Sequence, residues 1–151
     1  MDTENPLTTA IAASKCTRTY TVREGDTCDS ISAAHNASTY QLAVVNPAID
    51  SGCSNLEIGQ VLCLGTMGAD CTKTYTVVAG DVCESVVGAY GIDLPLLYAN
   101  NPILDVACDN LYIGEVVCVD NKYNVPSLAT NRTKPVPPPY AVPALPYCDE
   151  I

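Results

Sequence analysis

The chain has 151 residues, with 17 acidic and seven basic side chains and a formal net charge of −10. This excess of negative charge repels phosphate backbones and anionic lipids, so it argues against nucleic acids and membrane surfaces as partners. No apolar run approaches the roughly 18 residues of a transmembrane helix, and we therefore expect no membrane span.

A set of four cysteines occurs twice, 55 residues apart, with the same gaps of 12, 25 and 10 residues. Residues 16–65 and 71–120 match at 22 of 50 positions without a gap. One module is therefore written twice, and any site should appear in two versions within units of this size. The eight cysteines are Cys16, Cys28, Cys53, Cys63, Cys71, Cys83, Cys108 and Cys118.

The cysteines favour two disulfides in each module, because a unit this small needs cross-links to supplement its core. Zinc ligation is the competing interpretation. It prefers closely spaced pairs, which the gaps do not provide, and His35 is the only histidine. We expect no metal and no cofactor. The pairing stays open, since four cysteines allow three connectivities. Persistent disulfides indicate an oxidising, extracellular setting, so we expect a secreted protein whose signal peptide has been removed.

The predicted domains follow from the repeat and from composition. Residues 1–15 are expected to form a flexible leader, 16–65 the first module, 66–70 a short linker and 71–120 the second module. Residues 121–151 hold seven of the eleven prolines, which is typical of an extended tail without a core. The linker is short enough to make the modules close neighbours, though not necessarily in contact.

Each module begins with a predicted strand, at residues 19–22 and 74–77, where hydroxyl and larger side chains alternate. The following Gly-Asp pair predicts a turn into a helix. Asp26 and Asp81 are candidate N-caps, with Asp29 and Glu84 as capping-box partners.

A second short helix is expected after Ser38 and after Asp93, both good caps, and an Asn-Pro pair ends it. A last strand follows Gly59 and Gly114. The expected fold class is α+β: two tandem βααβ modules, each with a two-stranded antiparallel sheet and two helices, stabilised by disulfides.

This order of elements and residues resembles the LysM domain. The first module reads YTVREGDTCDSI, then LAVVNPAID and CSNLEIGQVLCL, and the second YTVVAGDVCESV, then LPLLYANNPILD and CDNLYIGEVVCV. The pattern covers about 100 of the 151 residues. The four-cysteine form is similar to the LysM domains of secreted fungal effectors.

The resemblance implies binding of N-acetylglucosamine oligomers, chiefly chitin, in a shallow groove between the loop after the first strand and the loop before the last. Carried over by position, the first groove comprises Gly25, Asp26, Thr27 and Cys28 facing Asn46, Pro47, Ala48 and Ile49. The second comprises Gly80, Asp81, Val82 and Cys83 facing Asn101, Pro102, Ile103 and Leu104. For several of these a purely structural role is an alternative: the glycines permit turns, the aspartates cap helices, the asparagines stop helices, and Ile49 and Leu104 belong to the core.

The two grooves differ at two positions. Thr27 of the first is replaced by Val82 in the second, which removes a hydroxyl that could bond a sugar. Ala48 is replaced by Ile103, which offers more apolar contact. We expect the first module to be the better binder.

We expect no enzyme. Asp50 and Asp105 recur, but no second carboxylic acid with a raised pKa is evident to pair with either, and no nucleophile, base and orienting group emerge as a set. His35 is assigned no role because Tyr90 replaces it in the repeat. Tyr98 and Tyr112 occur in the second module alone, where they add apolar surface for sugar, for protein contact or for ordinary packing.

Asn36 and Asn131 lie in N-x-[ST] sequons and are candidate glycosylation sites. Cys148 is a ninth cysteine without a partner in the repeat. A homodimer, bridged by ligand or linked through Cys148, is therefore one alternative. The rival to sugar binding is a structural or protein-interaction protein, which associates with itself or binds peptidoglycan, and whose modules have weak or lost affinity for chitin.

Overall fold

The computed structural model describes residues 16–50, 52–105, 107–127 and 141–144. The first module contains strand β1 (Cys16–Thr21), helices α2 (Cys28–His35) and α3 (Thr39–Val44), and strand β2 (Val61–Thr66). The second contains β3 (Thr74–Thr76), α4 (Cys83–Tyr90), α5 (Leu94–Asn100) and β4 (Val116–Cys118). In both modules the two strands pair antiparallel. The predicted α+β fold of two βααβ modules is confirmed.

Local sequence explains the helix ends. Asn36 and Gly91 terminate α2 and α4 in the left-handed conformation, with φ of 55° and 68°, which asparagine and glycine adopt most readily. The predicted caps of the second helices are confirmed: the Ser38 and Asp93 side chains accept from the backbone N–H three residues on, at 3.0 Å in each case.

Each module has its own apolar core between its helices and its sheet. Leu42 of α3 and its counterpart Leu97 of α5 are both 1% exposed. Fully burying such a side chain contributes roughly 1.5–3 kcal/mol. The first core comprises Val22, Ile31, Ala37, Leu42, Ile49, Leu62 and Leu64. The second comprises Val77, Cys83, Val86, Leu97, Leu104, Leu111, Val117, Val119 and Ala144.

Four disulfides close the described fold: Cys16–Cys63 and Cys28–Cys53 in the first module, Cys71–Cys118 and Cys83–Cys108 in the second. The outer pair joins the first cysteine, which begins β1 in the first module and precedes β3 by three residues in the second, to the last strand. The inner pair joins the first residue of the first helix to the loop before the last strand. The structure thus selects one of the three pairings that the sequence leaves open, and it selects the same one twice.

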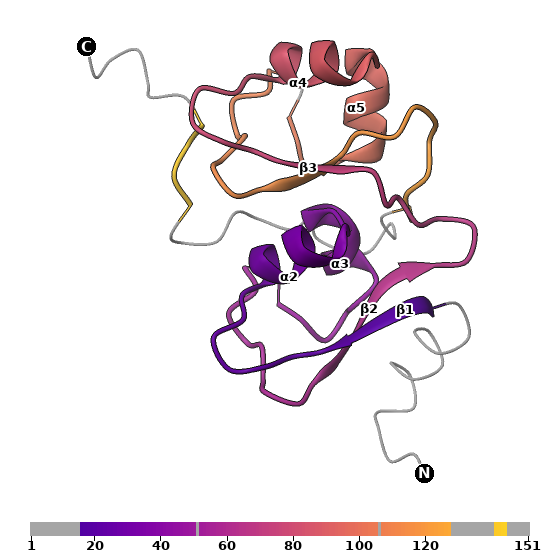
Figure 1. Cartoon of the computed structure of the whole chain (residues 1–151), viewed down its shortest axis with the longest axis vertical. Coiled ribbons are helices and arrows are strands. Elements are labelled where there is room, and N and C mark those ends of the chain that lie inside the picture. The colour runs from indigo at the N-terminus through magenta and orange to yellow at the C-terminus, as the bar shows by residue number, and fades with distance from the viewer. Residues whose placement is uncertain (1–15, 51, 106, 128–140, 145–151) are drawn as a thin grey trace.

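The two modules are stacked in contact. Figure 1 shows α2 and α3 of the first module between their own sheet and the strands of the second module. The Tyr112 hydroxyl donates to the Asp29 carboxylate at 2.7 Å, and the Val116 N–H donates to the Thr39 hydroxyl at 2.9 Å. The helical layer of the first module therefore covers the sheet of the second.

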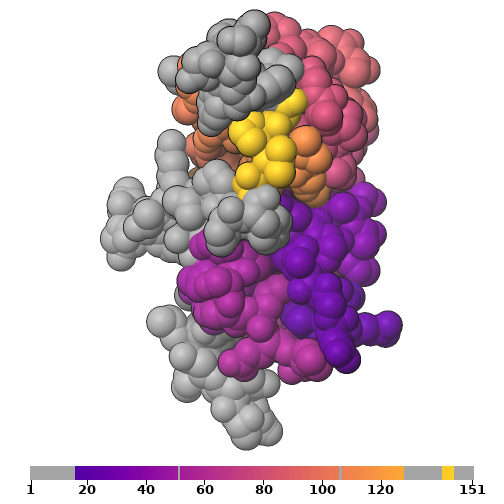
Figure 2. All heavy atoms as spheres, turned by 90° about the vertical axis from the view of Figure 1, so that its left-hand side faces the viewer, coloured from indigo at the N-terminus to yellow at the C-terminus, as the bar shows by residue number. Residues whose placement is uncertain are grey.

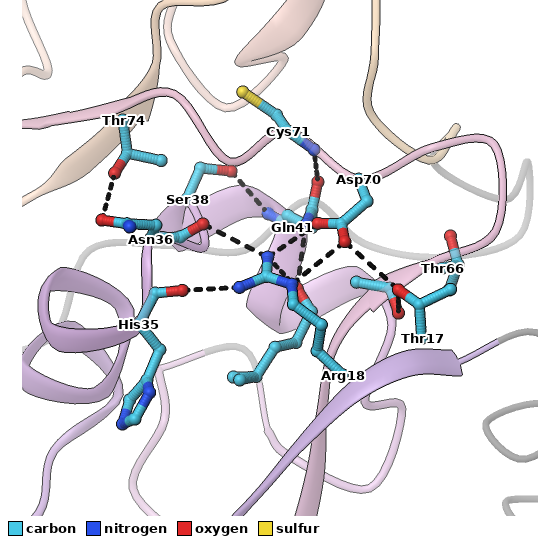
Figure 3. A network of polar contacts seen from close by, with 12 residues as sticks. Thr17, Arg18, His35, Asn36, Ser38, Gln41, Thr66, Asp70, Cys71 and Thr74 are labelled. Carbon is cyan, nitrogen blue, oxygen red and sulfur yellow. Dashed lines mark hydrogen bonds and ion pairs between the residues drawn. The ribbon is translucent and has the colours of Figure 1, made fainter.

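A polar network at the junction fixes this stacking (Figure 3). The Arg18 guanidinium pairs with Asp70 at 2.7 Å and donates to the His35 carbonyl at 2.6 Å. Burial raises the pKa of Asp70, but the hydrogen bonds and charge of Arg18 outweigh it and leave the pKa below its usual value. The Gln41 amide bonds the Leu64 carbonyl at 2.8 Å and accepts from the backbone N–H at position 71 at 3.1 Å. The linker is thereby bound to both the strands and the helices of the first module.

Candidate functional site

The turn between β1 and α2 forms the first wall of the predicted groove. Gly25 lies there at φ 88° and Gly80 lies at φ 90° in the second module, a conformation that favours glycine. Next to it, the Asp26 carboxylate accepts from the Tyr20 hydroxyl at 2.6 Å and from the Arg23 N–H at 2.8 Å. The Tyr20 bond, followed by the Arg23 amide, lowers the pKa of Asp26.

Asp81 is held in the same way, by the Tyr75 hydroxyl at 2.6 Å and by the Val78 N–H at 2.9 Å. That bond to Asp81, reinforced by burial and charge, raises the pKa of Tyr75 to about 12. The repeated geometry shows that these aspartates fasten the turn to its preceding strand.

The prediction that Asp26 and Asp81 cap the first helices is wrong by one residue. Thr27 is the N-cap of α2, where its hydroxyl accepts from the Ser30 N–H at 3.0 Å, and Ser30 completes the capping box. Val82 occupies the N-cap of α4 without a side-chain bond. Each aspartate is drawn instead to the tyrosine hydroxyl and the turn amide, because the turn points its carboxylate back toward the strand.

The opposite wall begins where α3 ends. The Asn46 side chain, 6% exposed, donates to the Leu42 and Cys63 carbonyls, both at 2.7 Å. The side-chain oxygen of Asn46 accepts a hydrogen bond from the Cys63 N–H at 2.8 Å. Asn101 makes the same three bonds in the second module, to Leu97 and Cys118. These asparagines bind helix to strand with their amide atoms, a role that sequence spacing alone did not indicate.

The residues after each asparagine differ in exposure between the modules. Pro47 and Ala48 are exposed, whereas Pro102 and Ile103 are half-buried. Ile103 packs against a cluster at the module interface that contains Tyr40, Cys71, Cys118 and Val125. Part of the apolar surface of Ile103, which the sequence assigned to the second groove, therefore packs in the module interface instead. Ile49 and Leu104 are 5% and 4% exposed and belong to the two cores.

A disulfide joins the two walls, and hydrogen bonds within the α3–β2 loop stabilise the second wall. The Cys28–Cys53 disulfide, with 6.2 Å between Cα atoms, connects the first residue of α2 to the α3–β2 loop. Within that loop, the Asn55 amide donates to the Ala48 carbonyl at 2.9 Å and accepts from the Asp50 N–H at 3.0 Å. The Asp50 carboxylate also accepts hydrogen bonds from the Ser54 hydroxyl and backbone N–H, which lower the pKa of Asp50. The ionised Asp50 side chain therefore stabilises the loop.

The second module repeats the disulfide and the loop hydrogen bonds with Cys83–Cys108, Asn110 and Asp105. The pKa of Asp105 is lowered, first by a hydrogen bond with Asp109 and then by backbone amides. In both modules the loop is rigidified before any ligand arrives.

The remaining candidate residues lie outside this site. The His35 ring packs at a tilt against Tyr20 with 4.6 Å between ring centroids, and the Tyr90 ring meets Tyr75 edge to face at 5.8 Å. Asn36 is exposed at the end of α2, and its side chain accepts from the Thr74 hydroxyl of the second module at 3.5 Å.

Tyr98 packs against the second core and Tyr112 lies in the module interface, 4% exposed. Asn131 and Cys148 lie outside the described residues. Within the described ranges, no group of three or more histidine, cysteine, aspartate or glutamate side chains is placed to hold a metal ion. In the same part of the chain no helix is long and apolar enough to cross a membrane.

Two rigid loops on a disulfide-closed βααβ unit, present twice, define a protein of two small tandem modules. The model of the LysM domain family matches residues 20–65 and 75–120, which is more than half of the chain. The chain therefore belongs to the LysM domain family, and the resemblance deduced from its sequence is confirmed.

Curated relatives agree with this assignment. The chain is 32% identical over 126 residues to the Secreted LysM effector LysM2 of Penicillium expansum, covering 78% of this chain and 36% of the relative. It is 34% identical over 133 residues to a secreted LysM effector of Pochonia chlamydosporia, covering 87% and 19%. The Non-secreted LysM effector LCP1 of Gibberella moniliformis is 31% identical over 125 residues, covering 80% and 16%. The chain thus spans about a third or less of the length of these three relatives.

Proposed function

We propose that this protein binds N-acetylglucosamine oligomers, chiefly chitin, without catalysis, through the loop pairs of its LysM modules. The observation that carries the proposal is the first module's loop pair, which leaves Gly25, Thr27, Pro47 and Ala48 exposed on a rigid frame. A neutral sugar suits a protein with a net charge of −10, because it is not repelled as an anionic ligand would be.

The exposed groups match the chemistry of an N-acetylated sugar. The Gly25 N–H makes no hydrogen bond within the described residues and is free to donate to a carbonyl or hydroxyl. The Thr27 hydroxyl already accepts from Ser30, which leaves its proton for a ligand oxygen. Ala48 offers a small apolar surface to a methyl group or to a ring face.

Retention on insoluble chitin and calorimetry with chitohexaose test this proposal. Ala48→Glu places a large charged side chain between the loops and should weaken binding by at least about tenfold. Ala34→Glu is the matched control, since this alanine is also exposed but lies on α2. Absence of retention by chitin, or equal affinity of the two variants, would remove the proposal for this site.

The alternative is a structural or interaction protein with weak or lost chitin binding, which includes binding of peptidoglycan. The observation that favours it is the packing of Ile103 into the module interface, together with the missing hydroxyl at Val82. The same retention assay with purified peptidoglycan separates the two, because preference for peptidoglycan over chitin would support the alternative.

The proposed location is extracellular, and four disulfides in the described residues fit an oxidising compartment. Relatives with names that begin "Secreted" and "Non-secreted" both occur, so the location is tested by immunoblotting of culture medium against cells. A biological task consistent with chitin binding is to sequester chitin fragments or to shield a fungal wall. Slower digestion of chitin by chitinase in the presence of the protein would support shielding.

A further inference from the structure

Residues 141–144 return to the second module and lie against both walls of its groove. The Ala144 carbonyl accepts from the Gly80 N–H at 2.7 Å, and the Ala144 N–H donates to the Leu111 carbonyl at 3.0 Å. The Ile113 N–H donates to the Val142 carbonyl at 2.8 Å. Figure 2 shows this yellow segment on the face of the second module, against residues drawn in orange. One short segment therefore connects the β3–α4 turn to the α5–β4 loop.

One side chain of this segment, that of Ala144, is also buried in the second module. Ala144 is 3% exposed and belongs to the second core, together with Cys83 and Leu104. Gly80, Cys83 and Leu104 are three of the eight residues expected to form the second sugar groove. The segment therefore occupies the Gly80 N–H and the apolar surface of Cys83 and Leu104, which a sugar in this groove would contact.

The first module provides an internal comparison, because the described residues place no such segment there. The counterparts of the three bonded groups are the Gly25 N–H, the Leu56 carbonyl and the Ile58 N–H, and none makes a hydrogen bond within the described residues. Ile58 is 70% exposed, against 40% for Ile113. Leu56 is half-buried, whereas Leu111 is 5% exposed. Among the described residues, nothing bonds to the first loop pair at the positions where residues 141–144 cover the second.

Ala144 resembles the ligand in its chemistry. An N-acetyl group carries a carbonyl, an amide N–H and a methyl, and Ala144 presents the same three groups to Gly80, Leu111 and the core. A segment tethered in this way competes at an effective concentration on the order of millimolar. A sugar that binds a single module weakly would not displace it.

We infer that residues 141–144 act as an internal ligand that fills the second groove, so that sugar binds to the first groove alone. The part of this inference that concerns sugar rests on the proposed function. The part that concerns the segment does not, and the two are tested separately.

Amide hydrogen exchange on the intact protein tests the segment without any sugar. The Gly80 and Ile113 amides should exchange at least about tenfold more slowly than Gly25 and Ile58, because only the former pair is bonded to the segment. Ala144→Asp places a carboxylate in an apolar core and should abolish this difference by expelling the segment. Val142→Asp is the control, since that side chain is 56% exposed and its expected effect is small. Equal exchange of the two pairs in the intact protein would overturn the inference.

Titration with chitohexaose, followed by amide chemical shifts, tests the sugar. In the intact protein and in Val142→Asp, Gly25 should shift while Gly80 does not, with one sugar bound per chain. In Ala144→Asp, both should shift and the stoichiometry should rise to two. Ala144→Pro, which removes the N–H donated to Leu111 but remains apolar, serves if the aspartate variant fails to fold.

The outcomes are distinguishable. Shifts at both Gly25 and Gly80 in the intact protein would refute the closure of the second groove while supporting the proposed function. Slow exchange at Gly80 with no shifts in any variant would support the internal ligand and remove the proposed function.

Discussion

Glu115 provides a stability test that depends on the stacking of the modules. It lies just before β4, is 1% exposed, and its carboxylate accepts from the Tyr112 N–H at 3.2 Å. Burial raises its pKa from 4.5 to about 8, and the nearby charge of Asp29 from the first module adds to this effect. We therefore expect Glu115 to carry a proton at neutral pH.

The sign of the pH dependence follows from this shift. The folded state binds the proton more tightly than the unfolded state, so stability is fully present below pH 4.5 and is lost as pH rises toward 8. From pH 5 to pH 7 this one group lowers the free energy of unfolding by about 2.5 kcal/mol, at 1.36 kcal/mol per unit of pKa shift. Asp29, whose pKa is raised by burial, adds a smaller contribution of the same sign.

Glu115→Gln should remove the dependence on Glu115 and keep the hydrogen bond. The first module already has glutamine at the equivalent position, where the Gln60 carbonyl accepts from the Glu57 N–H at 3.0 Å. Relative to the variant, the unmodified protein should therefore lose about 2.5 kcal/mol between pH 5 and pH 7.

Guanidinium unfolding at pH 5, 6, 7 and 8, with the disulfides intact and followed by far-UV circular dichroism, measures this difference. Gln60→Glu is the control. Gln60 is half-buried whereas Glu115 is 1% exposed, so a glutamate at position 60 keeps more contact with water and this variant should show a smaller dependence over the same range. A difference between Glu115→Gln and the unmodified protein that stays constant from pH 5 to pH 8 would refute the argument.

Three further substitutions test the site and the stacking. Asn46→Ala should lower the free energy of unfolding by about 2–3 kcal/mol in guanidinium unfolding, because it leaves buried backbone groups of α3 and β2 unpaired. A loss below about 1 kcal/mol would contradict the proposed role of Asn46 in joining α3 to β2. Thr27→Val copies the second module and should cost about 1 kcal/mol through loss of the α2 cap, while Val82→Thr should gain a similar amount; unchanged melting temperatures in both would exclude a capping role. Tyr112→Phe removes the bond to the Asp29 carboxylate and should cost about 1.5–3 kcal/mol at pH 7, with less effect at a pH where that carboxyl is protonated; the same loss at both pH values would argue against a charged acceptor.

The sequence by itself determined the modules and their elements. Strand alternation, the caps at Ser38 and Asp93 and the Asn-Pro stops are local signals, because they depend on backbone groups a few residues away. The duplication determined that each element would occur twice. Those signals gave the right order of strands and helices in both modules, but the first strand, predicted at 19–22, begins at Cys16 and ends at Thr21 in the structure.

Local signals failed where a side chain had two partners within reach. Asp26 is a residue type that often caps helices, yet its carboxylate bonds the Tyr20 hydroxyl and the N–H of the turn residue Arg23. Thr27 is the N-cap instead. Asn46 is a helix stop by sequence, but its amide reaches a strand 17 residues away. Such choices depend on how the strand and helix approach each other, which sequence spacing does not report.

Only the tertiary structure decided what covers each copy of the repeat. The disulfide pairing, the stacking of α2 and α3 on the second sheet and the return of residues 141–144 all join residues far apart in the chain. Two modules that match at 22 of 50 positions therefore differ most in their surroundings. Equivalent residues such as Gln60 and Glu115, or Ile58 and Ile113, acquire different burial because neighbours outside that copy, from the first module or from residues 141–144, cover the second copy.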